Sequence, residues 1–226
     1  MTRVNSPPEF FNTMYLPLMI KTDNLKVLLL GAGKVAVRKL EILCAVKANV
    51  TIISPDSIPE IELLIKENNC EYKRRSFRKG DCKGFDLVIA ATSDMAVNTE
   101  ISEEAKALHI PVNVVDVPDL CTAIFPAVIR DGDFIAAISS GSQAPFLAAE
   151  LRNQLREHTK GWGRWVEIGG RFRKIVLASV TEHKERRRLY DLFLAADMPD
   201  ENNAPPVGND LHEWIKWLEK MKSGRI

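Results

Sequence analysis

The chain has 226 residues, and 31 Lys and Arg against 30 Asp and Glu leave a net charge of only +1. This length is enough for one large domain or two small ones with a buried core, and the balanced charge argues against a general nucleic-acid binder. No run is long and apolar enough to span a membrane, and Pro7, Pro8 and Asn12 interrupt the apolar core that a signal peptide needs. We therefore expect a cytoplasmic protein whose partners include neither a membrane nor a nucleic acid.

Cysteine and histidine positions indicate no fixed metal site. The cysteines are scattered and form no Cys-x-x-Cys pair: Cys44, Cys70, Cys82 and Cys121. Free thiols in a reducing compartment are the simpler interpretation. The histidines likewise lack the spacing of metal ligands: His109, His158, His183 and His212.

The N-terminal segment precedes the first core strand. Residues 1–14 have the composition of a loose lead-in. The run Tyr15–Ile20 predicts a short strand, which Pro17 would confine to a sheet edge because proline has no N–H to donate. Asp23 and Asn24 are typical of a turn into the next strand.

A strand, a glycine turn and a helix are expected between Lys26 and Ala45. The apolar run Val27–Leu30 has the length of a buried parallel strand. The helical spacing that follows the turn predicts that Val35, Leu40 and Leu43 share one face.

The glycine turn matches the G-x-G-x-x-G/A pattern of dinucleotide-binding folds. Gly31 allows a sharp turn, and Gly33 lets a pyrophosphate approach the backbone at the helix N-terminus, beside Lys34 and Val35. Ala36 is the small third residue that lets helix and strand pack. The same pattern also occurs in tight turns of α/β proteins that bind no nucleotide. Here a buried strand precedes the turn and a helix follows it, and this context favours a dinucleotide site.

The second strand, Asn49–Ser54, is expected to end where the ribose of the adenosine binds, a place that usually carries an acidic residue. Here the position is near Ser54, followed by Pro55 and Asp56. Asp56 either reaches a ribose hydroxyl or caps the helix that begins near Ile58. No arginine stands at this position to favour the 2′-phosphate of NADP, and we expect NAD as the cofactor.

Helices and strands continue to alternate, which predicts an α/β fold with a doubly wound parallel sheet of the Rossmann type. The expected elements are a helix at 58–68, strands at 70–75 and 85–91, a helix at 96–108 and a strand at 111–116. The basic run Lys73–Arg75, with Arg78 and Lys79, fits a solvated edge. The strand that precedes Thr92 ends in small and hydroxyl residues, which suits a ligand crevice.

Two β-rich runs follow, at 122–130 and 133–139, and Asp131-Gly132 between them predicts a hairpin. A lone hairpin is marginal in water, so we expect it to pair with its twin from a second subunit.

The rest of the chain is expected to be helical, beginning with a helix from Phe146 to Arg156. Two apolar stripes mark later helices, Leu189, Leu192 and Phe193 in one and Leu211, Ile215 and Leu218 in the other. We therefore divide the chain into an NAD-binding domain at 1–116, a dimerisation region at 117–148 and a C-terminal helical domain at 149–226.

Several short motifs occur together in one order along the chain. They are Gly31–Lys39, Ala90–Asp94, Asn113–Asp116, Phe125-Pro126, Ser139–Gly141 with Ala144-Pro145, and Glu185–Arg188. In this combination the sequence resembles the precorrin-2 dehydrogenase/sirohydrochlorin ferrochelatase module of siroheme synthase. The resemblance covers nearly the whole chain, and because no methyltransferase domain follows, the chain resembles the stand-alone form.

The resemblance implies oxidation of the tetrapyrrole precorrin-2 to sirohydrochlorin by NAD⁺, followed in bifunctional members by insertion of Fe²⁺ to give siroheme. It implies a homodimer that exchanges the hairpin region and forms the tetrapyrrole site at the dimer cleft. It also implies a central role for Asp116 in both reactions and a place near the tetrapyrrole for Ser140. We further expect cofactor contacts at Thr92 and Asn113.

The expected catalytic residue also has a structural interpretation. Asp116 ends a core strand, where it is either a general base or a cap for the next turn. Because it lies beside the part of the crevice where the nicotinamide is expected, we take it as the general base.

The expected substrate-binding residues leave alternatives open. Ser139 and Ser140, with the backbone around Gly141, either bind substrate carboxylates or cap the next helix. The run Arg186, Arg187 and Arg188 either pairs with the carboxylates of a precorrin or forms a solvated helix face.

A second function remains open, which is a regulatory module that senses NAD through a Rossmann fold without catalysis. Such a module would need the turn at Gly31 but neither Asp116 nor the loop around Ser140.

Overall fold

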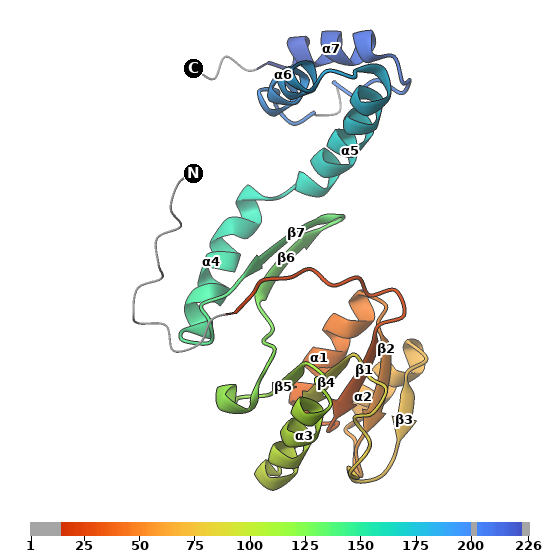
Figure 1. The fold of residues 1–226 in the computed structure, drawn as a ribbon, viewed down its shortest axis with the longest axis vertical. Helices are drawn as coiled ribbons and strands as arrows, with labels where there is room; N and C mark the ends of the chain where they lie inside the picture. The colour runs from red at the N-terminus through yellow and green to blue at the C-terminus, as the bar shows by residue number, and fades with distance from the viewer. Residues whose placement is uncertain (1–14, 200–202, 223–226) are drawn as a thin grey trace. The chain divides into compact units, whose positions relative to one another are not determined.

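The computed structural model describes residues 15–199 and 203–222, and these form two compact units. The first unit runs up to Phe125 and includes Gly141–Gln143; the second comprises Pro126–Ser140 and the chain from Ala144 onward. Figure 1 shows the strands and helices of both units. The division into three parts at residues 116 and 148 stays a prediction.

The first unit is built on one parallel sheet in the strand order β3-β2-β1-β4-β5. Its strands are β1 (Lys26–Leu30), β2 (Asn49–Ile53), β3 (Glu71–Lys73), β4 (Leu87–Ala90) and β5 (Val112–Val114). Its helices are α1 (Lys34–Ala45), α2 (Pro59–Glu67) and α3 (Met95–Ala107), with a 3₁₀ turn, η1, at Pro118–Leu120. The predicted doubly wound parallel sheet is confirmed.

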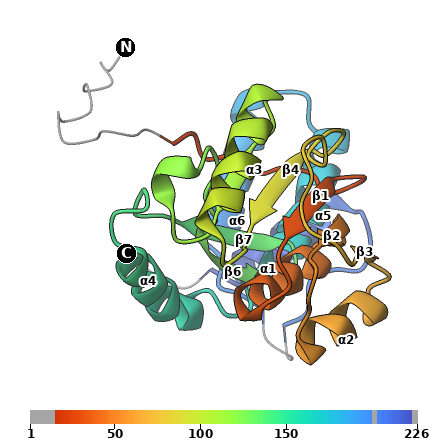
Figure 2. The ribbon, with the colours of Figure 1, turned by 90° about the horizontal axis from the view of Figure 1, so that it is seen from below.

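The central strand β1 shares its side chains between two cores. Val27 and Leu29 pack with α1 and α2 on one face of the sheet. Leu28 and Leu30 pack with α3 on the other face. Figure 2 shows α3 on one side of β1 and β4 and α1 on the other. A strand that is buried on both faces explains why its sequence is apolar without alternation.

Two sequence predictions for this unit are wrong. The run Tyr15–Ile20 forms no strand, because no other strand pairs with it, and Leu16 and Leu18 are exposed. In α1 the buried face consists of Ala36, Leu40 and Leu43, whereas Val35 is 41% exposed. The predicted lead-in at residues 1–14 lies outside the described residues.

The second unit begins with an antiparallel hairpin of β6 (Ala127–Asp131) and β7 (Phe134–Ile138). The predicted hairpin is confirmed, but its two-residue turn is Gly132-Asp133, one position later than expected. Gly132 has a φ of +55°, which suits the first central position of a type II′ turn. The side chain of Asp131 accepts the N–H of Gly163 at 3.1 Å and so ties the hairpin to the next helices.

Four helices complete this unit. They are α4 (Pro145–His158), α5 (Trp162–Ser179), α6 (His183–Leu194) and α7 (Leu211–Lys220). Both predicted apolar stripes contribute to their core, but its largest buried side chain is Trp214. The Trp214 ring packs on Phe172 at 5.7 Å between centroids, and its Nε1 donates to the Gly208 carbonyl at 2.9 Å. The aromatic core therefore joins α5 to α7.

Candidate dinucleotide-binding site

A cavity of 620 Å³ opens in the first unit, where β1, β2 and β4 end. Its volume lies in the range of small-molecule and cofactor sites. The predicted cofactor residues that line it are Gly31, Gly33, Lys34, Val35, Ser54, Pro55, Asp56 and Thr92. The parallel strands bring these segments together because their carboxyl ends lie at one edge of the sheet.

The two glycines of the turn serve different purposes. Gly31 has a φ of +99°, and a methyl group there would collide with the carbonyl of Ala91 in the neighbouring segment. Gly33 has ordinary extended backbone angles, and a methyl group there would meet no atom within 4 Å. The first glycine is required by the fold, whereas the second keeps the space above the backbone open.

That open space lies at the N-terminus of α1. Gly33 is the N-cap of this helix, and no side chain caps it among the described residues. The first N–H groups of a helix have no partner within the helix, and they carry the positive end of its dipole. The open backbone, the cavity and the uncapped N–H groups together fit the pyrophosphate of a dinucleotide.

The segment after β2 forms the side of the cavity where a ribose is expected. Ser54 is buried, and its hydroxyl donates to the Asp56 carbonyl at 2.6 Å. Tyr72 of β3 holds the same segment by donating to the Ser54 carbonyl at 3.1 Å. Asp56 is not the cap of α2, because Ile58 occupies the N-cap position without a side-chain bond. The role of Asp56 at a ribose hydroxyl stays a prediction.

An arginine stands at this rim, although the sequence around residue 54 contains none. The guanidinium of Arg74, which directly follows β3, donates to the Ser57 hydroxyl at 3.2 Å, and Ser57 lines the cavity. The absence of an arginine from the sequence around Ser54 therefore does not mean that none comes near this rim. Arg74 is distant in sequence and reaches the rim because β3 runs beside β2.

The segment after β4 is ordered by its own hydrogen bonds. The carboxylate of Asp94 caps α3 by accepting the N–H groups of Ala96 at 2.9 Å and Val97 at 3.3 Å. The hydroxyl of Thr92 donates to Asn98 Oδ1 at 2.8 Å, and the Asn98 amide donates back to the Thr92 carbonyl. These bonds present Thr92 to the cavity in one fixed conformation.

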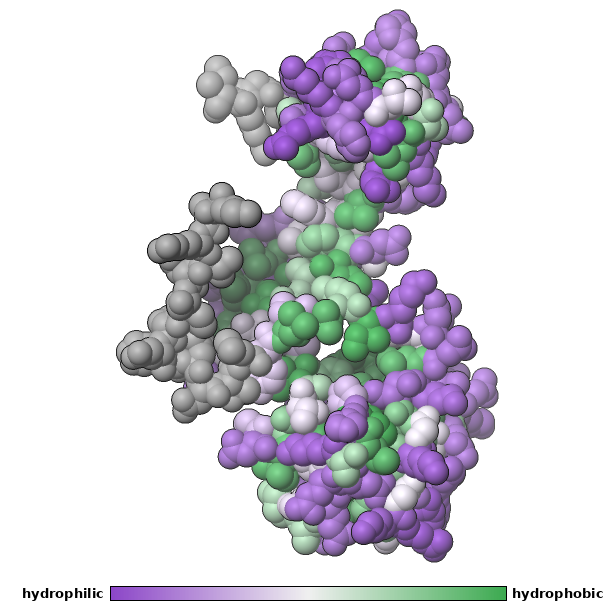
Figure 3. Space-filling view, viewed as in Figure 1, coloured by the Kyte–Doolittle hydropathy of each residue, from purple (hydrophilic) through white to green (hydrophobic). Residues whose placement is uncertain are grey.

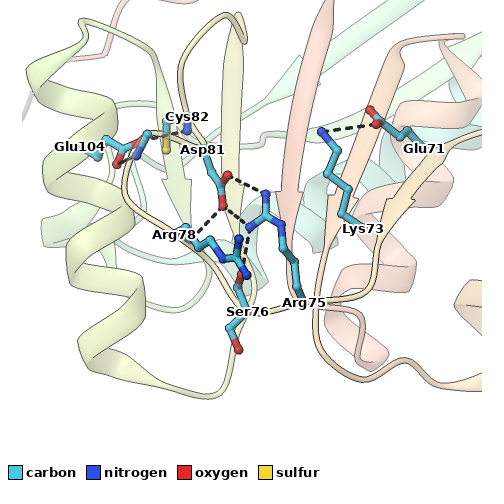
Figure 4. Close-up of polar contacts among 9 residues, drawn as sticks. Glu71, Lys73, Arg75, Ser76, Arg78, Asp81, Cys82 and Glu104 are labelled. Carbon is cyan, nitrogen blue, oxygen red and sulfur yellow. Dashed lines mark hydrogen bonds and ion pairs between the residues drawn. The ribbon is translucent and has the colours of Figure 1, made fainter.

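The loop between β3 and β4 carries Ser76 and Phe77 to the cavity wall. It is fastened by Arg75, whose guanidinium donates to both carboxylate oxygens of Asp81 at 2.6 and 2.7 Å (Figure 4). The hydrogen bond from Arg75 also lowers the pKa of Asp81. Because this side chain is mostly buried, the prediction of a solvated edge is wrong for Arg75.

Hydrogen bonds to α3 also anchor the loop between β3 and β4. The carboxylate of Glu104 accepts the backbone N–H groups of Gly80 at 2.7 Å and Cys82 at 2.8 Å (Figure 4). The Cys82 side chain is fully buried, and this burial raises its pKa. The sequence contains no local pattern that pairs Glu104 with this loop.

Asp116 follows β5 with a φ of +60°, and its side chain is exposed. It is not among the residues that line the cavity. Burial lowers the pKa of Lys39 of α1, and Cys121 and Asp116 raise it in part, which places Asp116 near this ammonium. The Lys39 ammonium also lies 4.1 Å from the ring centroid of Phe125. Lys39 ends the motif Gly31–Lys39, and the sequence alone does not single it out as a site residue.

Asn113 lies within β5 and is buried. Its amide nitrogen donates to the Ala123 carbonyl at 3.0 Å, and its Oδ1 has no hydrogen-bond partner among the described residues. Asn113 does not line the cavity, so its contact with a cofactor stays a prediction.

The predicted substrate residues Ser139, Ser140 and Gly141 precede α4. The Ser140 hydroxyl accepts the N–H of Ala144 at 3.0 Å, immediately before the helix. Ser140 therefore organises the entry to α4. Its role toward a substrate stays a prediction.

The three arginines of α6 have different environments. Arg186 donates to the Val180 carbonyl at 2.7 Å and fastens the turn between α5 and α6. Arg188 pairs with Glu185 at 2.7 Å. Arg187 is exposed, which leaves it as the arginine of this run best suited to bind a ligand.

The sequence of this chain is similar to those of known NAD(P)-binding proteins and siroheme synthases. Residues 18–127 match the family model described as "Putative NAD(P)-binding". Siroheme synthase of Pseudomonas putida strain F1 is 36% identical over 178 residues, which cover 78% of this chain and 38% of that protein. Siroheme synthase of Methylococcus capsulatus strain Bath is 36% identical over 181 residues, which cover 80% of this chain and 38% of that protein.

A solved structure shares the fold. The structure of "SirC, precorrin-2 dehydrogenase" matches with a TM-score of 0.65 at 19% identity, over 92% of this chain and 98% of that chain. The chain spans about two fifths of the length of the curated relatives that it matches. Within the described part of the chain, no helix has both the length and the apolar character needed to cross a membrane.

Proposed function

Because the chain belongs to the same family as the siroheme synthases over the segment that it shares with them, we propose that it oxidises precorrin-2 to sirohydrochlorin with NAD⁺. The observation that carries this proposal is the open backbone at Gly33, above an uncapped helix N-terminus in a cavity of cofactor size. The relatives' names and the shared fold supply the substrate class.

The cofactor is held by the residues of the cavity in this proposal. The N-terminal N–H groups of α1, reached past Gly33, bind the pyrophosphate, and the segment from Ser54 to Asp56 receives the ribose of the adenosine. Ser76 and Phe77 close the cavity wall. When bound, NAD⁺ supplies the acceptor for the hydride that the macrocycle loses.

Dehydrogenation of the macrocycle also releases a proton, and Asp116 is the proposed general base. Asp116 follows β5 and its side chain is exposed, so a carboxylate is accessible there to a substrate. Lys39 lies near this carboxylate, because Asp116 is one of the groups that act on the pKa of Lys39.

We propose Fe²⁺ insertion as a second reaction of the same chain, because the relatives are named as siroheme synthases and siroheme contains iron. Iron is then a substrate, and Asp116 accepts protons from the pyrrole nitrogens as the metal enters. Ser139, Ser140 and the exposed Arg187 are the proposed contacts to the carboxylates of the tetrapyrrole.

A homodimer is part of the proposal. Phe146, Leu147 and Leu151 of α4 are exposed, at 72%, 57% and 45%. Figure 3 shows hydrophobic residues gathered over α4 and the β6–β7 hairpin. Contiguous apolar surface of this kind marks protein–protein contacts, and a two-stranded sheet gains stability from a further partner.

The test is an anaerobic assay of the purified protein with precorrin-2, NAD⁺ and Fe²⁺. We expect NADH and sirohydrochlorin to form together, and siroheme to follow if the chain also inserts iron. NADH without siroheme assigns the dehydrogenase reaction alone. Binding of NAD⁺ without turnover of precorrin-2 would contradict the proposal and favour the regulatory module that senses NAD.

Asp116→Asn provides the matched variant, because it removes the charge and keeps the size of the side chain. We expect a loss of dehydrogenation of at least about a hundredfold with an unchanged thermal unfolding curve. NADH formation near the wild-type rate in this variant would remove Asp116 from the mechanism.

A further inference from the structure

Three polar side chains meet at the rim of the cavity, beside the segment that follows β2. The Ser57 hydroxyl donates to the carboxylate of Glu62 at 2.6 Å, and Arg74 donates to the same carboxylate oxygen at 2.8 Å. Arg74 also contacts the Ser57 hydroxyl at 3.2 Å. Ser57 lines the cavity, so this cluster reaches the cavity through Ser57.

The sheet explains why an arginine is present there. Ile53 at the end of β2 is paired in register with Lys73 at the end of β3. Residues that follow the two strands therefore leave the sheet at the same edge. Arg74 is the first residue after β3, and its guanidinium lies 5.5 Å from the ring centroid of Tyr72, which helps to hold it at the rim.

This edge is where the fold receives the ribose of the adenosine. Enzymes of this fold that use NADP commonly place an arginine near that ribose to accommodate the 2′-phosphate, and those that use NAD place an acceptor for the free hydroxyl. Here the arginine is present but already paired with a carboxylate, which also takes the hydroxyl hydrogen of Ser57.

We propose that Glu62 makes the site prefer NAD⁺ to NADP⁺ by holding Arg74 and Ser57 away from a 2′-phosphate. This inference rests on the proposed dinucleotide site and adds a selectivity residue to it. A 2′-phosphate entering beside Ser57 meets a carboxylate that is ionised and an arginine that is neutralised by it. The 2′-hydroxyl of NAD⁺ carries no charge and is not disfavoured in this way.

The cluster can be altered without loss of the fold. The side chains of Arg74 and Glu62 are 60% and 49% exposed, and exposed ion pairs of this kind contribute little to stability. The hydrogen bonds from Ser57 and then from Arg74 lower the pKa of Glu62.

The experiment is a calorimetric titration of the full chain with NAD⁺ and with NADP⁺ in the absence of tetrapyrrole. For Glu62→Gln we expect NADP⁺ to bind about tenfold more tightly than to the wild type, with NAD⁺ changed by less than about twofold. Glu60→Gln is the matched control, because Glu60 is an exposed carboxylate in the first turn of the same helix, and we expect it to leave the preference unchanged.

A second variant tests whether Arg74, once Glu62 no longer pairs with it, is the group that binds the 2′-phosphate. Adding Arg74→Ala to Glu62→Gln should abolish the gain in NADP⁺ affinity, because no cation is left at the rim. Equal ratios of the two affinities in Glu62→Gln and Glu60→Gln, or a wild type that prefers NADP⁺, would overturn the inference and leave the dinucleotide site intact. Failure of the wild type to bind either nucleotide would overturn the proposed function as well.

Discussion

Gly31 and Gly33 stand two positions apart and meet different physical constraints. The backbone at Gly31 has a φ that L-residues with a side chain rarely adopt, and the Ala91 carbonyl closes the space beside it. The backbone at Gly33 has angles and free space that alanine could adopt. Its glycine suits both the N-cap of α1 and the close approach of a bound ligand. Substitutions at Gly31 and Gly33 can therefore distinguish what the fold needs from what nucleotide binding needs.

Exchange of each glycine for alanine should therefore give opposite results. Gly31→Ala should lower the free energy of unfolding by about 2 kcal/mol or more, because it adds a positive-φ penalty and a collision. Gly33→Ala should cost no more than about 1 kcal/mol, the usual cost of alanine at an N-cap, and weaken NAD⁺ binding about tenfold or more. Urea denaturation and nucleotide titration measure the two effects, and a stable Gly31→Ala protein would contradict the first.

The loop between β3 and β4 is held in place by side-chain hydrogen bonds. It has no helix of its own, yet Arg75, Asp81 and Glu104 tie it to itself and to α3. A bidentate pair between arginine and carboxylate adds geometric precision as well as energy. The loop can therefore present Ser76 and Phe77 to the cavity without further secondary structure.

The pair between Arg75 and Asp81 should make stability depend on acidity. The hydrogen bonds from Arg75 lower the pKa of Asp81 in the folded state below its ordinary value of 3.8. The stabilisation is therefore present above this value and is lost as the pH falls through the folded-state pKa. Asp81→Asn should cost about 1.5 kcal/mol at neutral pH and less in acid, as measured by urea denaturation at several pH values.

Asp119→Asn is the control for this effect, because Asp119 is an exposed carboxylate of η1. This variant should follow the pH dependence of the wild type. An Asp81→Asn protein that loses the same stability at every pH would show that the ion pair is not the source of the acid sensitivity.

The whole molecule raises the question of assembly. Phe146 on α4 is 72% exposed although it is large and apolar, and the proposed dimer gives it a partner. Phe146→Glu should shift the protein from dimer to monomer, because a carboxylate in an apolar contact loses its hydration. Sedimentation equilibrium measures the mass. Leu194→Glu, at a site that is 75% exposed at the end of α6, should leave the mass unchanged.

This prediction fails in either of two ways. A wild type that is monomeric at micromolar concentration would remove the dimer from the proposal. A Phe146→Glu protein that stays dimeric would place the contact elsewhere than on α4.

Local patterns were sufficient for the parallel sheet, the hairpin and the terminal helices. β1 and β4 are apolar runs, as strands buried on both faces must be. The turn between β1 and α1 contains Gly31, whose positive φ favours glycine. The same reasoning assigned a strand to Tyr15–Ile20, and it failed because a strand exists only where another strand pairs with it.

The sequence by itself determined most of the strands and helices, although not the end segment Tyr15–Ile20, and it determined that the first glycine turn precedes a helix. The reason is that side-chain periodicity and backbone sterics act over a few residues. Only the tertiary structure decided that Arg74 meets Ser57 and Glu62, and that Glu104 holds Gly80 and Cys82. These contacts join residues 12 to 24 positions apart. They depend on which strands lie side by side and in which register, and no short stretch of sequence contains that information.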